Sequence, residues 1–516
     1  MELPAFRNEP FTDFSSPLNR ATMERALAEV RAQLGRTYPL IIDGERISTE
    51  KTIASVNPAR PSEIVGYAAA ATPELANQAL DAATARFERW RKTPADKRAG
   101  YLFRAAQIMR ERKFELAAWI VYEVSKTWAE ADADVAEAID FCEYYGREML
   151  RLAQPPELVQ MPGERDELIY IPLGVGVCIP PWNFPLAITT GLVVAPVVAG
   201  NTVVLKPSPR SPVVAAKLLE VLEAAGLPPG VVNLVTGEDA VIGDLLVDSP
   251  KTRFIAFTGS KQVGLRIFER AAKVHPGQKW LKRAILEMGG KDTIVVDETA
   301  DLDAAAQGIV QSAFGFQGQK CSACSRVVAT APVYDTLLEK VVERARQLTV
   351  GDPADPESAL GAVIDGRALD KVRHYLEIGR REGRLVLGGE AAPDGGYFVP
   401  PTIFADVAPD AALAQEEIFG PVLAFIKAPD FDTALAIANN TEYGLTGGVY
   451  SRDRERLQRA REDFHVGNLY LNRKITGAMV GAHPFGGFNM SGTDSKTGGP
   501  DYLLLFLQGK SIAEKV

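Results

Sequence analysis

A cysteine in a short polar loop is the first residue of this sequence that could do covalent chemistry. Cys321 stands in the run GQKCS at 318–322. A thiol becomes a nucleophile when nearby positive charge, backbone N–H groups or a base favour its thiolate, and Lys320 is adjacent. Two other interpretations remain open. Cys321 could be a small buried hydrophobe, or it could form a C-x-x-C pair with Cys324 that is redox-active or half of a zinc site.

Two further residues have side chains that could complete such a reaction. Asn183, in the run PWNFP at 181–185, carries an amide that could donate to a developing oxyanion. Glu287, in the run EMGGK at 287–291, could act as a general base on water. Each has an ordinary alternative when it is taken alone, because Asn183 could be a turn residue and Glu287 a solvated loop carboxylate.

A third group of residues indicates binding of a phosphate-bearing cofactor. The run Phe257-Thr258-Gly259-Ser260 leads into a helix through Gly264, so N–H groups and a positive helix end would face an anion. Lys206 and Ser208 follow another strand and could reach a ribose or phosphate. Glu417 offers a carboxylate for ribose hydroxyls, and Phe419 offers an aromatic face for a ring. The G-x-G-x-x-G fingerprint is absent, so no ordinary Rossmann motif is indicated.

Alternating strands and helices must position these side chains. Apolar, β-branched runs at 174–179, 202–205, 231–235, 254–257 and 293–296 predict buried strands. Helical patterns stand between them, and residues 73–153 are strongly helical throughout. Buried strands that alternate with helices predict a parallel, doubly wound sheet. The apolar run 186–200 is short for a bilayer and is predicted to be a buried helix.

A second α/β series begins after Glu287, with a helix near 301–314, a strand near 326–329 and a helix at 334–347. The predicted fold class is therefore α/β, with two doubly wound domains and a small β extension. Residues 1–154 and 172–288 are assigned to an N-terminal helical region and a dinucleotide-binding domain, and 289–488 to a catalytic domain. Residues 155–171 and 489–516, with the strand-like run 503–507, are assigned to an oligomerisation extension.

Composition excludes several classes of function. A formal net charge of -9 argues against nucleic acid or an anionic membrane as a partner. Four cysteines in 516 residues do not make a disulfide framework, and the N-terminus lacks a secretory signal pattern, so a cytoplasmic location is expected. The chain has four histidines and no second C-x-x-C, so we expect no metal site.

Taken in order, these motifs resemble those of the aldehyde dehydrogenase superfamily from about residue 40 to the C-terminus. The motifs are PWNFP with Asn183, KPS with Lys206, FTGS with Gly264, EMGGK with Glu287, GQKC with Cys321 and EEIFGP with Glu417. The runs RKITGAMVG at 473–481, HPFGG at 483–487 and KCSACSR at 320–326 resemble the branch of the superfamily that oxidises glutamate γ-semialdehyde. That branch carries out the second step of proline catabolism.

This resemblance implies a role for each residue. Cys321 attacks the aldehyde, Asn183 and the Cys321 N–H hold the oxyanion, NAD takes the hydride, and Glu287 activates water. The remaining implied contacts are those to the substrate. Its carboxylate is anchored by the Ser322 hydroxyl and the N–H groups of Gly477 and Ala478, its stem packs on Phe184 and Phe485, and its ammonium meets Glu137 with Lys320 as the balancing charge.

One departure from the family pattern concerns the cofactor. Relatives that prefer NAD commonly carry Glu three residues after the cofactor lysine, and here that position is Pro209, followed by Arg210. Loss of a carboxylate removes repulsion toward a 2′-phosphate. We therefore predict NAD as the main cofactor with appreciable use of NADP.

The rival functions share much of this chemistry. A dehydrogenase for succinate or aminoadipate semialdehyde would differ only in the anchor loop at 474–485. A CoA-acylating enzyme would not need Glu287, and a catalytically silent binding module would not need Cys321, Asn183 and Glu287 together. The chain has no room for a flavin domain, so a proline dehydrogenase would be a separate, possible partner. We expect a homo-oligomer, at least a dimer, that covers the exposed strand edges of the extension.

Overall fold

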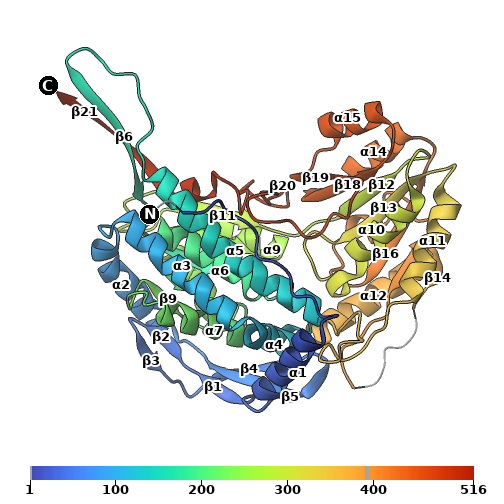
Figure 1. Cartoon of the computed structure of the whole chain (residues 1–516), viewed down its shortest axis with the longest axis horizontal. Helices are drawn as coiled ribbons and strands as arrows, with labels where there is room; N and C mark the ends of the chain where they lie inside the picture. The colour runs from blue at the N-terminus through green and yellow to red at the C-terminus, as the bar shows by residue number, and fades with distance from the viewer. Residues whose placement is uncertain (1–2, 390–394) are drawn as a thin grey trace.

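Two seven-stranded sheets organise the chain, and the computed structural model describes residues 3–389 and 395–516 (Figure 1). The first sheet has the order β11-β10-β7-β8-β9-β2-β3. Its first five strands are parallel, and β2 and β3 form an antiparallel edge. The strands are β11 (Arg283–Glu287), β10 (Thr252–Thr258), β7 (Val175–Ile179), β8 (Thr202–Leu205), β9 (Val232–Leu234), β2 (Leu40–Ile42) and β3 (Glu45–Ile47).

The second sheet has the order β14-β15-β16-β13-β12-β18-β19, and only the pair β14–β15 is antiparallel. Its strands are β14 (Arg384–Leu387), β15 (Thr402–Ala405), β16 (Val422–Ala428), β13 (Cys324–Thr330), β12 (Asp292–Val296), β18 (Thr446–Tyr450) and β19 (Asn468–Leu471). Two mostly parallel sheets in one chain confirm the predicted α/β class.

Helices cover both sheets. A small third sheet contains β1 (Arg36–Tyr38), β5 (Arg60–Ala69) and β4 (Thr52–Asn57). The helices around this sheet and the first one are α1 (Pro17–Arg31), α2 (Pro73–Trp90), α3 (Ala95–Glu111), α4 (Lys113–Val124), α5 (Trp128–Leu152), α6 (Ala187–Val198), α7 (Pro212–Ala224), α8 (Asp244–Asp248) and α9 (Lys261–Ala271). Around the second sheet lie α10 (Leu302–Phe314), α11 (Tyr334–Arg346), α12 (Gly366–Glu382), α13 (Ala412–Gln415), α14 (Phe431–Asn439) and α15 (Arg454–Asp463).

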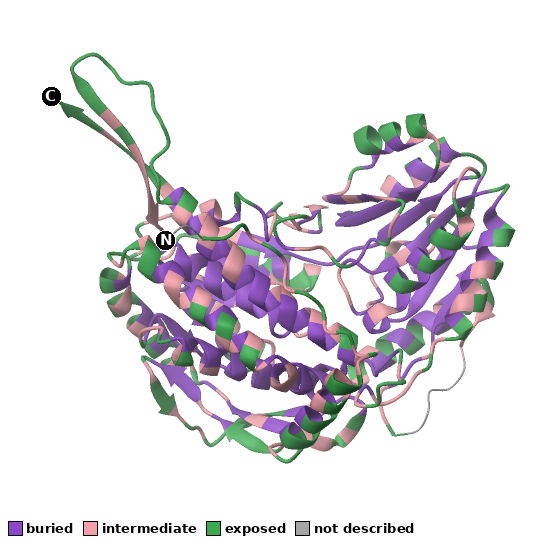
Figure 2. Cartoon of the chain, viewed as in Figure 1, coloured by how far each residue is buried: buried purple, intermediate pink, exposed green. Residues whose placement is uncertain are grey.

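The core is largest where α3 to α7 cover the first sheet (Figure 2). Helix α6 is apolar over nearly its whole circumference and is buried along nearly its whole length, so the buried helix predicted from the run 186–200 is confirmed. Within the described residues, no helix combines the length and the apolar character that a membrane crossing demands.

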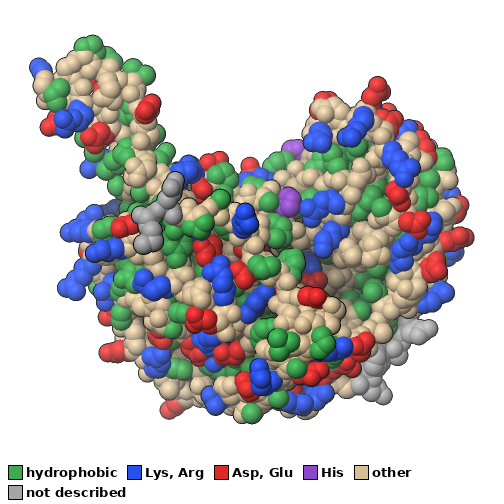
Figure 3. Space-filling view, in the orientation of Figure 1, with side chains coloured by type: hydrophobic (Ala, Val, Ile, Leu, Met, Phe, Trp, Pro, Cys, Tyr) green, Lys and Arg blue, Asp and Glu red, His purple; other side chains and the backbone are tan. Residues whose placement is uncertain are grey.

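The direction of the strands decides where the functional residues meet. Strand β11 ends at Glu287, and the short connector 288–291 leads directly into β12. The carboxyl ends of the parallel strands of the first sheet therefore face the amino ends of those in the second sheet. Ligand sites in parallel α/β sheets lie at the carboxyl ends of strands, so this junction is the expected site. We call each seven-stranded sheet with its helices a lobe, and the outline of the molecule dips between the first lobe and the second (Figure 3).

A two-stranded arm projects from the first lobe (Figure 1). Strand β6 (Glu164–Pro172) pairs antiparallel with β21 (Leu507–Lys515) along nine consecutive residue pairs. Strand β21 is mostly solvent-exposed, and β6 is exposed toward its outer end and half-buried toward the lobe (Figure 2). Two strands without further cover are marginally stable in water, which favours contact of the arm with another surface.

The C-terminal segment differs from the expectation in one part. The strand-like run 503–507 is not a strand, because Tyr502–Phe506 form a 3-10 helix and β21 begins only at Leu507. The reason is packing: Phe506 meets Phe254 edge-on at 5.2 Å, and Tyr502 stacks on Tyr145 at 5.5 Å. Leu503 is buried together with these two rings, whereas in a strand it would point to the opposite face from both of them.

The residues ahead of this helix also lie outside the arm, although the sequence assigned all of 489–516 to the extension. The Met288 N–H donates to the Ser491 carbonyl at 2.7 Å, and the Leu286 N–H donates to the Thr493 hydroxyl at 2.9 Å. This part of the chain therefore lines β11 beside Glu287. Backbone groups at the end of β11 find their partners here, which keeps the segment at the junction of the lobes.

Candidate active site

The loop that carries Cys321 has an unusual backbone. After α10 the chain passes through left-handed conformations at Phe316, Gln317 and Gly318, with φ of 50°, 55° and 67°. A Cβ on Gly318 would lie 2.4 Å from the Gly420 carbonyl oxygen, so only glycine fits there. Such strained conformations persist only where surrounding contacts hold them, and they concentrate at functional sites.

Two buried glutamines hold this loop in place. The Gln317 amide donates to the Ala362 carbonyl at 2.8 Å, and the Gln319 side-chain oxygen accepts from the Ile364 N–H at 2.9 Å. Both glutamines are fully buried. The nucleophile loop is therefore clamped to the segment 362–364 before it reaches Cys321, which is half-buried at the start of a turn into β13.

Asn183 lies against the same loop. Strand β7 ends at Ile179, and the turn that follows brings the buried Asn183 side chain to the Gln319 carbonyl, to which its Nδ2 donates at 3.0 Å. Nδ2 carries two hydrogens, so a second donor remains for a substrate oxygen. The structure thus brings Asn183 and the Cys321 loop together, as an oxyanion site requires.

Glu287 lies at the end of β11 and is buried. Its carboxylate accepts from the Ser495 hydroxyl and from the Gly487 N–H, the latter at 3.3 Å. Burial raises the pKa of Glu287 to about 7, against the opposing effect of these hydrogen bonds. A carboxyl group with this pKa exchanges protons at neutral pH, as a general base must. Sequence reasoning missed Ser495, because it lies 208 residues away along the chain.

The electrostatics of Cys321 differ from the expectation. Burial raises the pKa of its thiol, and the carboxylates of Asp292 and Glu287 raise it further. Lys320 was expected to favour the thiolate, but its Nζ is directed to the Glu130 carboxylate at 2.7 Å. The adjacent cation is therefore committed to a partner on α5, and formation of the thiolate depends on a base or on bound ligands.

The residues proposed for the cofactor collect at the carboxyl ends of β8 and β10. Lys206 is buried, and its ammonium contacts Asp239. Ser260 caps the start of α9, and its hydroxyl accepts from the Val263 N–H at 3.4 Å. A Cβ on Gly264 would lie 2.4 Å from the Met288 sulfur, so the helix can lie this close only with glycine. Ser208, Thr258 and Gly259 are half-buried at the same edge, where a ligand can reach them.

Glu417 and Phe419 reach the junction from the second lobe. The Glu417 carboxylate accepts from the Gly290 N–H at 3.1 Å, and burial raises its pKa. A Cβ on Gly289 would lie 2.1 Å from the same carboxylate, so the two glycines form a cradle for it. The Phe419 ring meets Trp182 edge-on at 5.7 Å. A half-buried carboxylate from the second lobe, together with a buried cation and a helix N-terminus from the first, suits the ribose and phosphates of a dinucleotide.

Most residues proposed to bind the substrate come from the loops after β19, the Cys321 loop and the turn after β7. Gly477 has a φ of 75°, and the Arg473 guanidinium holds its loop through the Thr476 carbonyl at 3.3 Å. Ala478 and Phe485 are half-buried in the loop segments that follow β19, and Ser322 is buried beside Cys321. Phe184 follows Asn183 in the turn after β7.

On α5, burial and the neighbouring Asp134 carboxylate together raise the pKa of Glu137 to about 8. Lys320 was expected to balance Glu137, but its ion pair is with Glu130 instead. Sequence reasoning missed Glu130 and Asp134. Glu130 lies seven residues and Asp134 three residues before Glu137, which places all three on one helical face and is a signal that could have found them.

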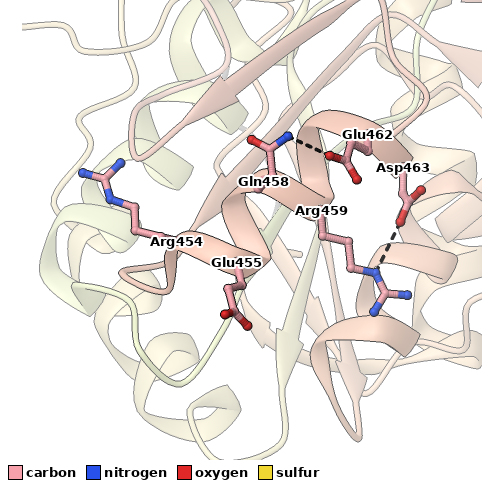
Figure 4. Close-up of a pocket in the computed structure, with 6 residues that line it drawn as sticks. All are labelled: Arg454, Glu455, Gln458, Arg459, Glu462 and Asp463. Atoms are coloured by element: carbon pink, nitrogen blue, oxygen red, sulfur yellow. Dashed lines mark hydrogen bonds and ion pairs between the residues drawn. The ribbon is translucent and has the colours of Figure 1, made fainter.

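Two cavities differ in their relation to this site. The larger, about 540 Å³, is an open surface depression along the outer helix α15, where Arg459 pairs with Asp463 (Figure 4). It contains none of the residues proposed above. A smaller cavity of about 20 Å³ is lined by Gly318, Lys320, Glu417 and Phe419 among others. The candidate cofactor residues of the second lobe therefore share one lining with the nucleophile loop.

Comparison with known proteins gives full-length matches. A sequence model described as the aldehyde dehydrogenase family matches residues 46–512. The curated 1-pyrroline-5-carboxylate dehydrogenases of Geobacillus kaustophilus (strain HTA426) and Bacillus cytotoxicus are 60% and 59% identical over 509 and 510 residues, with 99% of both chains covered.

Solved structures agree with these sequence matches. The structure of 1-pyrroline-5-carboxylate dehydrogenase from Thermus with bound NAD is 54% identical, with a TM-score of 0.99 over 100% of both chains. The structure of proline utilization A from Bdellovibrio bacteriovorus is 47% identical with a TM-score of 0.98, and the match covers 100% of this chain and 54% of that one. In sequence and in fold, over nearly all of its length, this chain belongs to the aldehyde dehydrogenase family.

Proposed function

We propose that this protein oxidises L-glutamate γ-semialdehyde, the open form of Δ1-pyrroline-5-carboxylate, to L-glutamate with NAD. The observation that carries the proposal is the contact of the Asn183 amide with the Cys321 loop, with Glu287 at the adjoining strand end. The full-length relatives named 1-pyrroline-5-carboxylate dehydrogenase support this choice of substrate.

The reaction divides into an acylation and a hydrolysis. The Cys321 thiolate adds to the aldehyde carbon, and the resulting thiohemiacetal oxyanion accepts hydrogen bonds from Asn183 Nδ2 and from the Cys321 N–H. Lys206, Ser260 and Glu417 would hold NAD, and bound NAD would supply the hydride acceptor that lets this carbon become a thioester. Glu287 then takes a proton from water as the water attacks the thioester, and the Cys321 thiolate leaves. One aldehyde and one water thus give one carboxylate, two protons and one hydride, which would pass to the bound acceptor.

Substrate recognition is assigned to the groups around Cys321. We assign the substrate carboxylate to the Ser322 hydroxyl and to the N–H groups of Gly477 and Ala478. Glycine with a φ of 75° lets the backbone present such N–H groups without an obstructing side chain. Phe184 and Phe485 pack on the aliphatic stem. Because the other rival semialdehyde dehydrogenases share the same chemistry, this anchor loop carries the discrimination between substrates.

The substrate ammonium is assigned to Glu137. With a pKa of about 8, Glu137 is largely protonated at neutral pH. An ammonium group at contact distance favours the ionised carboxylate, so binding would lower this pKa. Lys320 acts in this arrangement through Glu130, with which it pairs at 2.7 Å. In this ion pair the Glu130 carboxylate neutralises the positive charge of Lys320, which is adjacent to Cys321.

NAD is the proposed main cofactor, with NADP accepted as well. Position 209 is proline, so no carboxylate opposes a 2′-phosphate there. Arg210, the adjacent cation, pairs with Asp365 at 2.6 Å. Its charge is therefore partly compensated, which fits moderate use of NADP better than a preference for it.

Assembly and location follow from other features. We propose a homo-oligomer in which the exposed β6–β21 arm packs on another copy of the chain. The four cysteines are free, as expected for a cytoplasmic protein. A proline dehydrogenase is the proposed source of the substrate, and the likeness to proline utilization A, of which the match covers 54%, motivates a test of contact between the two proteins.

Initial rates of NADH formation test the function. Wild-type protein is compared with Cys321→Ala on pyrroline-5-carboxylate, with succinate semialdehyde as the second substrate. A strong preference for pyrroline-5-carboxylate, lost in the variant, is expected. A preference for succinate semialdehyde moves the protein to another branch of the family, and absence of turnover on either supports a silent binding module.

A further inference from the structure

A fully buried ion pair lies behind the candidate active site. Lys126, just after α4, and Asp134, on α5, place Nζ and Oδ2 2.9 Å apart, and neither side chain is exposed to solvent. Taking two charges out of water costs about as much as their attraction returns, so a buried pair is weak evidence for a role in stability. What each partner contacts is therefore the more informative observation.

Asp134 holds the segment that carries Asn183. Its second oxygen, Oδ1, accepts from the Ala187 N–H at 2.6 Å. Ala187 is the first residue of α6 and lies four residues after Asn183. A carboxylate at a helix N-terminus satisfies a free N–H group and interacts favourably with the helix dipole. Asp134 thereby sets where α6 begins and where the preceding turn lies.

Lys126 contacts both halves of the site at once. Its ammonium lies 3.6 Å from the centroid of the Phe184 ring and 4.9 Å from that of the Phe316 ring. Phe184 follows Asn183, and Phe316 opens the left-handed run that leads to Cys321. A cation over an aromatic face is attracted to it, and more strongly when both are shielded from water. One charge therefore links the Asn183 turn to the nucleophile loop.

We propose that Lys126 and Asp134 are positioning residues that hold the Asn183 amide against the Cys321 loop. This inference rests on the proposed thiohemiacetal chemistry, in which Asn183 and Cys321 act on the same carbonyl group. The pair acts through Phe184, Ala187 and Phe316 and has no direct role in the reaction. Loss of the pair would shift the oxyanion donor relative to the nucleophile and slow the chemical steps.

Helices α4 and α5 also supply a matched control. Lys113 and Asp132 form a second ion pair at 3.0 Å, with side-chain exposures of 11% and 3%. Asp132 also accepts a backbone N–H, that of Thr12, at 2.8 Å. The control pair therefore resembles the first pair in burial, in its residue types and in the hydrogen bond that its aspartate accepts from a backbone N–H. It holds the N-terminal segment, which none of the proposed catalytic steps uses.

The experiment compares K126M/D134N with K113M/D132N. Each double variant removes both charges, so no buried charge is left unpaired. The measurements are kcat and KM for pyrroline-5-carboxylate, the Kd for NAD, and the thermal unfolding midpoint. We expect kcat of K126M/D134N to fall by about 100-fold, because a shift of about 1 Å at reacting groups has this effect. The Kd for NAD and the kcat of K113M/D132N are expected to stay near wild type.

The single variants add a readout that a structural role would not produce. If Lys126 and Asp134 act as one unit, K126M and D134N each lower kcat about as much as the double variant does. Equal kcat values in K126M/D134N and K113M/D132N would overturn the proposal, and so would additive losses in the single variants. If K126M/D134N does not fold, Phe316→Leu replaces it, because that variant keeps both charges and removes only a ring that Lys126 contacts. Unchanged kcat in Phe316→Leu would then count against the proposal.

A second aldehyde separates this proposal from the proposed function. All variants are also assayed with propanal, which passes through the same oxyanion and nucleophile but needs no anchor loop. Oxidation of propanal without oxidation of pyrroline-5-carboxylate by wild type would reject the substrate and still test the pair. If wild type oxidises neither propanal nor pyrroline-5-carboxylate, the thiohemiacetal chemistry is rejected. The proposed role of Lys126 and Asp134 is then rejected as well.

Discussion

The Asn183 amide donates to the carbonyl oxygen of Gln319, two residues before Cys321, at 3.0 Å. One residue comes from the turn after β7 of the first sheet and the other from the loop before β13 of the second. Because this hydrogen bond uses one Nδ2 hydrogen, the donor for a substrate oxygen is oriented by the same loop that carries the thiol. The two lobes are thus joined at the atoms that the proposed reaction needs.

Asn183→Ala removes the proposed oxyanion donor together with this link. We expect kcat to fall by about 100- to 1000-fold, as loss of one such donor does, with little change in KM for the aldehyde. Steady-state kinetics on pyrroline-5-carboxylate would measure this, with the thermal unfolding midpoint as a check of folding. A folded variant that keeps wild-type kcat would remove Asn183 from the mechanism.

Glu287 is expected to control the pH dependence of hydrolysis. Its raised pKa, about 7, means that the carboxyl group is protonated and inactive as a base below that pH. The rate of hydrolysis should therefore rise as pH increases through about 7 and fall as pH decreases. In Glu287→Gln we expect a burst of about one NADH per site followed by slow turnover, because the thioester forms and is not hydrolysed. Rapid-mixing absorbance measurements distinguish the burst from turnover, and a missing burst would place Glu287 in acylation instead.

Gly289 is expected to be required for cofactor binding. An added Cβ would lie 2.1 Å from the Glu417 carboxylate and displace it. Loss of a charged hydrogen-bond partner costs about 1.5–3 kcal/mol, so Gly289→Ala should raise the Kd for NAD by about 10- to 100-fold. Fluorescence titration measures this Kd. Gly100→Ala is the control, because its added Cβ meets nothing closer than 3.7 Å. An unchanged Kd in Gly289→Ala would show that Glu417 does not contribute to NAD binding.

Pro209 is expected to influence the choice between NAD and NADP. Pro209→Glu restores a carboxylate where a 2′-phosphate would lie, so the ratio of kcat/KM for NADP to that for NAD should fall by about tenfold or more. Pro209→Gln has a similar size without charge and should change the ratio less. If wild type already discriminates as strongly as Pro209→Glu, position 209 does not explain cofactor choice.

The arm is expected to support assembly. Truncation after Leu507 removes β21 and leaves β6 as an unpaired edge. We expect a smaller assembly by analytical ultracentrifugation, with the residues around Cys321 still folded, because the arm projects away from the lobes (Figure 1). An assembly of unchanged size would show that other surfaces hold the copies together.

Sequence patterns were most informative where local structure and packing agree. The strand predicted at 202–205 is strand β8, Thr202–Leu205, because a β-branched run is typical of a strand buried on both faces. The run 503–507 was misread, because a short apolar run does not distinguish a strand from a buried turn. Only the contacts of Tyr502 and Phe506 with Tyr145 and Phe254 decide between the two.

By itself the sequence determined the family and the α/β fold class, since ordered motifs and buried alternating runs are local features that the full-length comparisons confirm. The roles of single residues stay predictions. Only the tertiary structure decided their neighbours: Ser495 beside Glu287, Glu130 as the partner of Lys320, and Lys126 between two rings. Such partners lie far apart along the chain or on faces that only packing defines, and the energy of a charge depends on its burial. Spacing in a sequence therefore does not encode them.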